Sequence, residues 1–197
     1  QSFTPDELET ARELRALALE SGLAYDITSE LTTRIGNRLA GSENDARAVQ
    51  WAVAKLESLG FDRVWTEPAT FPSWTREYER VTITAPVEQD LVSLAIGFSP
   101  GTPEGGVEAE VVMFDDLAAL EAAPDAAVAD RIVFIRKRME RARDGSGYGP
   151  AVQARGQGSM VAAEKGALAL VIRSVGTSTN RFAHTGTMRF DAGSRRI

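Results

Sequence analysis

Side chains that could carry out metal or nucleophilic chemistry are scarce in this chain. It contains one histidine, His184, and no cysteine, which excludes disulfides, thiolate metal sites and cysteine nucleophiles. A two-metal hydrolytic site needs about five nitrogen or oxygen ligands and a carboxylate that activates the bridging water, yet no His-x-Asp pair or HExxH motif is present. Ser178 lies near His184 in sequence, but no G-x-S-x-G elbow accompanies it. We therefore expect no catalytic residue and no metal ligand here, and neither activity nor bound metal in the isolated chain.

His184 itself has two interpretations that the sequence leaves open. It can be a loop histidine that forms hydrogen bonds with the backbone near a turn. It can instead lie on the wall of a pocket and face a ligand. A role as a metal ligand is disfavoured, because no partner ligand is recognisable in the sequence.

A cluster of cationic residues occupies the stretch 131–143. Its members are Arg131, Arg136, Lys137, Arg138, Arg141 and Arg143. The simplest interpretation is a solvated strand end followed by a loop. The alternative is an anion site, because guanidinium groups bind carboxylates through two parallel hydrogen bonds. Nucleic-acid binding is disfavoured, since the cluster has no interleaved aromatic residues and the formal charge of the chain is −6.

The stretch 144–150, with sequence DGSGYGP, is flexible by composition. It can be a mobile lid over a cleft or a long surface connection, and the sequence does not separate the two. It is not a phosphate-binding loop, because the lysine and the following Ser or Thr of that motif are missing.

Capping residues and apolar spacing predict the elements that position these residues. Thr4 and Glu7 form a capping box at the start of a helix over 4–20. Apolar residues recur every four positions over 27–35 and predict a second helix, which Gly36 ends. A third helix with an inward apolar face is predicted over 43–59. Alternation and β-branched residues then predict short strands, with a Gly/Pro-rich loop and a short helix between them. The strands are 64–66, 78–85, 91–96, 107–114 and 131–135, the loop is 97–106, and the helix is 117–122.

The stretch from Arg155 to Val175 carries the most information. Ser159 is a predicted N-cap for a short helix that ends near Lys165, and Gly166 supplies the left-handed position that stops it. An unbroken apolar run over 167–172 predicts a strand covered on both faces. A helix packed tightly onto the following strand is therefore expected.

This stretch, followed by His184-Thr185-Gly186, resembles the protease-associated (PA) domain of the two-zinc aminopeptidase/glutamate carboxypeptidase family. Residues 34–42 and 48–52 look similar to a loop and helix near the start of that family's catalytic domain. The resemblance implies an α/β protein with a boundary near Pro86. Residues 1–86 would be a helical N-terminal piece of a zinc-exopeptidase α/β/α domain. Residues 87–197 would be a β-rich PA lid domain with short helices, incomplete at its C-terminus.

The resemblance also implies a function. The parent would be a zinc-dependent exopeptidase that hydrolyses dipeptides or short peptides, with zinc bound by a part that follows these residues. Tyr148 and Arg155 stand where the family also has Tyr and Arg, so they and His184 are candidates for the substrate cleft. The expected partners are the remainder of the catalytic domain or a second chain, a peptide substrate and a second copy in a homodimer, but not nucleic acid or a membrane. The expected location is the periplasm or the exterior, with the signal peptide already absent.

A non-enzymatic PA-type protein-interaction module is the alternative function. The helices predicted between Thr4 and Leu59 discriminate between the two, because a free PA module does not need them, whereas a peptidase packs them on its catalytic sheet. Without that sheet their apolar stripes should remain exposed.

Overall fold

The structure is a computed structural model that describes residues 3–181, 184–191 and 193–197. The chain divides into two compact units, Gln1–Ser73 and Trp74–Ile197. In the described part of the chain, the first unit contains helices and no strand, and the second contains both helices and strands, so the predicted α/β class is confirmed. The boundary expected near Pro86 falls inside the second unit.

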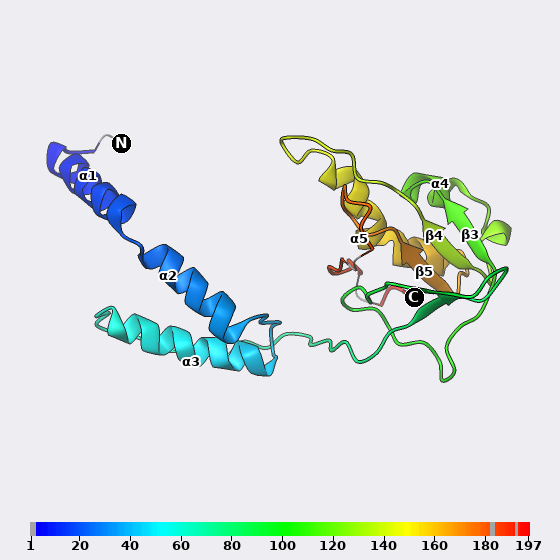
Figure 1. The fold of residues 1–197 in the computed structure, drawn as a ribbon, viewed down its shortest axis with the longest axis horizontal. Coiled ribbons are helices and arrows are strands. Elements are labelled where there is room, and N and C mark those ends of the chain that lie inside the picture. Colours follow the sequence, from blue (N-terminus) through cyan, green and yellow to red (C-terminus); the bar gives the residue numbers. More distant parts are fainter. Residues whose placement is uncertain (1–2, 182–183, 192) are drawn as a thin grey trace. The chain divides into compact units, whose positions relative to one another are not determined.

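The first unit consists of three helices and the turns between them (Figure 1). They are α1 (Pro5–Glu20), α2 (Leu23–Glu30), which continues into a π-helical turn (Leu31–Ile35), and α3 (Glu43–Ser58). The predicted capping box is confirmed, because the Thr4 backbone N–H donates to the Glu7 carboxylate at 2.7 Å and the Glu7 N–H donates to the Thr4 hydroxyl at 3.3 Å. Local capping therefore defines the start of α1 without tertiary contacts.

Polar contacts hold α3 against α2 and the turn after it. Lys55 forms an ion pair with Glu30 at 2.6 Å, and the Arg47 guanidinium donates to the Arg34 carbonyl at 3.2 Å. None of the described residues 3–73 is buried. The expectation that these helices expose apolar side chains is confirmed. Exposed members include Leu8, Leu14, Leu17, Leu19, Leu23, Tyr25, Val49 and Leu56.

The second unit is built on a three-stranded parallel sheet (Figure 1). Its strands β3 (Val111–Phe114), β4 (Ile132–Ile135) and β5 (Ala169–Ile172) pair in that order, so β4 is central. Helix α4 (Leu117–Ala122) lies in the connection from β3 to β4, and α5 (Tyr148–Glu164) lies in the connection from β4 to β5. The parallel sheet is therefore formed by two consecutive βαβ connections, as expected for parallel strands.

A separate antiparallel hairpin precedes the sheet. It pairs β1 (Val81–Ile83) with β2 (Gln89–Leu91) on either side of Pro86. The predicted strands 78–85, 91–96 and 107–114 are therefore too long or displaced. Residues 64–66 form no strand among the described residues, since they have no partner to complete a hydrogen-bonded ladder. Propensity alone does not make a strand, because its backbone groups need that ladder.

The register of the parallel sheet explains where the core lies. Adjacent positions on the three strands form two rows on one face: Val112, Val133 and Leu170, then Phe114, Ile135 and Ile172. These rows pack against buried side chains of α4 and α5. The opposite face is not equally covered, since Val111 and Met113 are 62% and 55% exposed. In β5 itself, all four residues Ala169–Ile172 are half-buried, so the cover predicted on both faces of the strand 167–172 is only partial.

Helix α5 is longer than predicted. It begins at Tyr148, so Ser159 lies inside it rather than at its N-cap. The Ser159 side chain is buried and its hydroxyl forms hydrogen bonds with both the N–H and the carbonyl of Ile197. Gly166, with φ of 81°, ends the helical segment as predicted. The flexible stretch 144–150 is accordingly a short turn followed by the first turn of a helix.

Candidate functional site

The start of α5 is fixed by a close backbone approach. Gly147 precedes the helix, and a side chain there would overlap the carbonyl oxygen of Glu140. Only glycine fits this position without a backbone shift. Pro150 lies in the first helical turn, where its missing N–H costs no hydrogen bond. Gly147 therefore anchors the helix and its first residue, Tyr148, next to the loop that follows β4.

Two of the predicted cleft residues are brought together on α5. Tyr148 and Arg155 are seven positions apart, which is two helical turns and places them on one face. The Arg155 guanidinium donates a hydrogen bond to the Tyr148 hydroxyl at 2.7 Å, and its carbon lies 5.8 Å from the centre of the tyrosine ring. Tyr148 remains 41% exposed. The helix therefore presents a phenol and a guanidinium as one polar pair.

The segment that contains the third candidate crosses beside this pair. A side chain at Gly186 would meet the Arg155 guanidinium carbon at 2.6 Å, so that guanidinium packs directly on the Gly186 backbone. The Gly186 carbonyl accepts from the Gly97 N–H at 2.7 Å, and the Arg189 N–H donates to the Gly156 carbonyl at 2.8 Å. The segment is thus held on one side by α5 and on the other by residues near 97.

The His-Thr-Gly motif divides into anchoring and exposed positions. The Thr185 hydroxyl donates to the Ala95 carbonyl at 3.1 Å and accepts from the Arg76 guanidinium at 3.1 Å. His184 is exposed, and its side chain forms no hydrogen bond with any described residue. The structure therefore fixes Thr185 and Gly186 and leaves His184 in an exposed position two residues from the Arg155 contact.

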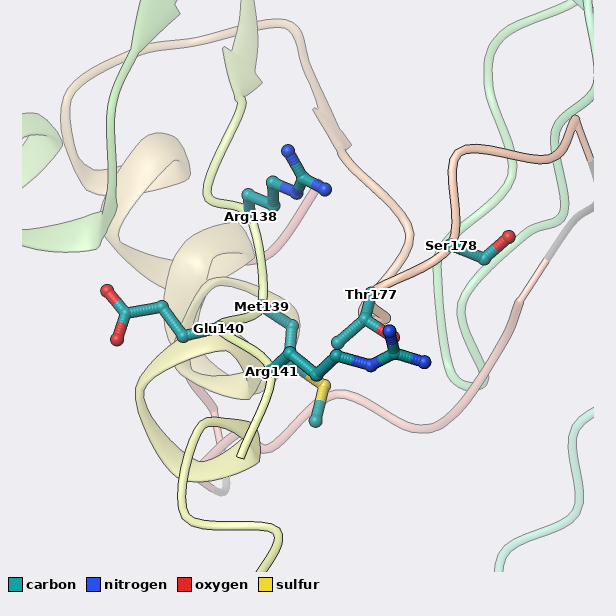
Figure 2. A pocket seen from close by; sticks show the side chains of 6 residues that line it. All are labelled: Arg138, Met139, Glu140, Arg141, Thr177 and Ser178. Carbon is teal, nitrogen blue, oxygen red and sulfur yellow. The ribbon is translucent and has the colours of Figure 1, made fainter. Parts of the chain in front are cut away.

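A second feature lies at the carboxyl edge of the parallel sheet. The loop after β4 and the loop after β5 enclose an open hollow of about 680 Å³ (Figure 2). Its lining residues are Arg138, Met139, Glu140, Arg141, Thr177 and Ser178. The carboxyl ends of parallel strands are where open α/β sheets commonly bind ligands.

The comparisons with known proteins agree with the family resemblance. No protein-family model matches the chain. Carboxypeptidase Q of Xenopus laevis is 32% identical over 163 residues, which cover 83% of this chain and 33% of that protein. Human carboxypeptidase Q is 31% identical over 174 residues, which cover 88% of this chain and 35% of that protein. A crystal structure of a peptidase M28 precursor from Shewanella amazonensis is similar with a TM-score of 0.87 and 48% identity, over 96% of this chain and 43% of that chain.

The chain resembles the zinc-peptidase family. The family resemblance predicted from residues 34–42, 48–52 and 155–186 is thus confirmed. The chain spans about a third of the length of the carboxypeptidase Q relatives that it matches.

Two further findings concern metal-binding groups and membrane-spanning helices among the described residues. Within 3–181, 184–191 and 193–197, no group of three or more His, Asp or Glu side chains is placed to hold a metal ion. Among the same residues, no helix is both long enough and apolar enough to cross a membrane.

The positioning roles of several residues in the site were not predicted from the sequence, although Thr185 and Gly186 belong to the motif that carries the resemblance. Gly147, Gly186 and Thr185 position the α5 start and the crossing segment, and Arg76 braces Thr185. Gly147 had a signal in the sequence, because a loop glycine beside a helix start often marks a close backbone approach. The bracing role of Arg76 had no signal in the sequence, since the two residues that accept its hydrogen bonds, Ala95 and Thr185, lie 19 and 109 positions away.

Proposed function

We propose that this chain is the N-terminal and PA-domain portion of a zinc-dependent exopeptidase that hydrolyses dipeptides or short peptides. The similarity to the peptidase M28 precursor carries this proposal, because it includes 96% of the chain at 48% identity. The unit Trp74–Ile197 contains the segment 87–197 predicted as a PA domain, and in the proposal it is the lid of the enzyme. The zinc ligands and the carboxylate that activates the attacking water belong to the remainder of the parent protein.

The proposal is tested by comparing the product of the complete gene with the 197-residue chain. Zinc content is measured by mass spectrometry after dialysis, and hydrolysis is followed as amino-acid release from a panel of dipeptides. The parent should hold zinc, lose activity with a chelator and regain it when zinc is added back. The chain alone should neither retain zinc nor hydrolyse the dipeptides. A chelator-insensitive parent, or zinc-dependent hydrolysis by the chain alone, would contradict the proposal.

Within this enzyme, Tyr148, Arg155 and His184 are proposed to face the substrate cleft. The arrangement that supports this role is the guanidinium of Arg155, which the Tyr148 hydroxyl and the Gly186 backbone hold in one orientation. A guanidinium that is already oriented loses less conformational entropy when it donates to a substrate carbonyl or carboxylate. His184 has no bonding partner among the described residues and is exposed, so it is available for a similar contact.

Kinetics of an Arg155 variant test the cleft assignment. In the parent enzyme, Arg155→Ala should lower kcat/KM about tenfold or more, because a charge-assisted hydrogen bond is worth about 1.5–3 kcal/mol. Its zinc content should not change. Tyr148→Phe is the matched variant, since it keeps the ring and removes only the hydroxyl that orients the guanidinium, and it should give a smaller decrease. Unchanged kinetics together with a lower Tm would assign Arg155 to bracing the Gly186 segment instead.

The parent protein is further proposed to supply the partner of the first unit and to be exported from the cytosol. The exposed apolar side chains of α1–α3 are proposed to be covered by the rest of the catalytic domain, and the family resemblance supports export of the parent. Fractionation of cells that express the complete gene tests the location, and recovery in the cytosol would contradict it. Light scattering of the parent tests whether it forms a homodimer.

A further inference from the structure

We propose that the hollow at the carboxyl edge of the sheet is a binding site for a small oxyanion with two negative charges. The site is defined by Arg138, Arg141 and Thr177 (Figure 2). The proposal does not rest on the peptidase function, since it needs only the second unit of this chain.

Ion pairing divides the cationic cluster into two parts. Arg136 forms an ion pair with Asp115 at 2.5 Å, and the bond lowers the pKa of that carboxyl below its ordinary value of 3.8. Lys137 pairs with Asp116 at 3.5 Å. These two aspartates directly follow β3, so the neighbouring strand supplies the charges that neutralise the start of the loop after β4.

The arginines in the later part of the same loop have no ion-pair partner among the described residues. Arg138 and Arg141 form no ion pair with any described residue, and both line the hollow. Glu140, which lies between them in the sequence, also lines the hollow and is the carboxylate closest to them along the chain. Figure 2 shows the Glu140 side chain extending to one side of the loop, whereas the guanidinium groups of Arg138 and Arg141 extend toward the side where Thr177 lies. Two guanidinium groups that form no ion pair with a described carboxylate therefore border the open hollow.

The chemistry of the lining favours an oxyanion. Each guanidinium offers a planar fork of N–H donors that matches carboxylate or phosphate oxygens. The half-buried Thr177 adds a hydroxyl that can donate to a third oxygen. Two guanidinium groups match a ligand with two negative charges better than a ligand with one, because each charge then has its own partner. The shared ligand chemistry is a dianionic oxyanion, either a small dicarboxylate or a phosphate group.

Calorimetric titration of the full 197-residue chain with succinate and with inorganic phosphate tests the site. Acetate and chloride at matched ionic strength are the controls for charge number and for screening. One saturable site for succinate, phosphate or both is expected, with acetate bound about tenfold more weakly. Saturation by succinate alone identifies a dicarboxylate site, and saturation by phosphate alone identifies a phosphate site.

Two variants with related charge changes make the test specific. Replacing both Arg138 and Arg141 by Gln should reduce the affinity about tenfold or more, since the charge-assisted bonds are lost. Arg143→Gln, which removes a charge from the same loop outside the hollow, should change it less than about twofold. Circular dichroism confirms folding, and the single variant Arg141→Gln replaces the double variant if that one unfolds. No saturable binding, or equal losses for the hollow and Arg143 variants, would overturn the proposal.

Discussion

Leu120 and Ile135 in the second unit are fully buried, whereas Leu17 and Leu19 in α1 are 66% and 74% exposed. All four side chains belong to regular helices or strands. The difference lies in what covers them: the second unit folds two helices onto one face of its sheet, whereas residues 3–73 of the first unit form no strand. The comparison shows that capping and periodicity are sufficient to define a helix, but burial of an apolar face is what stabilises it in a folded protein.

The largest expected effect is the difference in the free energy of unfolding between two large-to-small substitutions, one at a buried and one at an exposed position. Ile135→Ala should destabilise the second unit by about 2–5 kcal/mol, because it leaves a cavity in a closed core. Leu17→Ala should change the free energy of unfolding of this chain by less than about 0.5 kcal/mol, as exposed positions usually do. Urea unfolding followed by circular dichroism measures both. Equal losses would remove the distinction between the units.

Substitutions of two glycines at the start of α5, Gly147 just before the helix and Gly149 within it, should change stability in opposite directions. Gly147→Ala should cost about 1–3 kcal/mol, because the new methyl overlaps the Glu140 carbonyl and the helix start must shift. Gly149→Ala has open space around it and should stabilise α5 by about 0.5–1 kcal/mol through helix propensity. Thermal unfolding shows whether each variant has a lower or a higher Tm than the unchanged chain. A higher Tm for Gly147→Ala would show that the close approach to Glu140 is absent in solution.

Loss of the capping box should be visible directly as loss of helix in the first unit. Thr4→Ala should cost α1 about 1 kcal/mol, and no buried face is available to compensate. Thr10→Ala, inside the same helix, is the control and should raise helicity, since alanine has the higher propensity. Circular dichroism at low temperature records both changes. An unchanged signal in Thr4→Ala would mean that contacts other than the cap hold α1.

The smallest effect concerns pH. The hydrogen bond from Lys55 lowers the pKa of Glu30 from its ordinary value of 4.5. A carboxyl with a lowered folded-state pKa stabilises the folded form above that ordinary value, and the stabilisation is lost as the pH falls through the folded-state pKa. In the complete parent protein, where these helices are expected to be protected, amide protection of α2 and α3 should therefore decrease on acidification below about pH 4.5. Glu30→Gln should abolish this pH dependence, and a variant that retains it would exclude the Glu30–Lys55 pair as its source.

Sequence reasoning succeeded where the deciding interactions are local. The Thr4–Glu7 box, the start of α3 after Ser42 and the stop at Gly166 each depend on atoms within four residues. It failed where the partner is distant. Ser159 has the residue type of an N-cap, but its hydroxyl forms a hydrogen bond with Ile197, 38 positions away. The predicted strands were too long because the ends of a strand are set by its hydrogen-bonded partner strand.

The candidate sites show the same division. The spacing of Tyr148 and Arg155 becomes meaningful only once α5 is known to begin at residue 148. The cationic cluster was recognised in full, yet only the fold reveals that Asp115 and Asp116 neutralise part of it. Residue type identified the chemistry available to each group, and tertiary pairing decided which groups retain an uncompensated charge.

The central claim is that the first unit is a part of a larger catalytic domain that covers its apolar helices. Hydrogen exchange of α1–α3 in the 197-residue chain and in the complete parent protein tests it most directly. The claim predicts exchange near the unprotected rate for these helices in the chain, with protection in the parent that approaches that of β4 and α5. Equally strong protection of α1–α3 in both proteins would contradict the claim, because the first unit would then be stable without the rest of the parent.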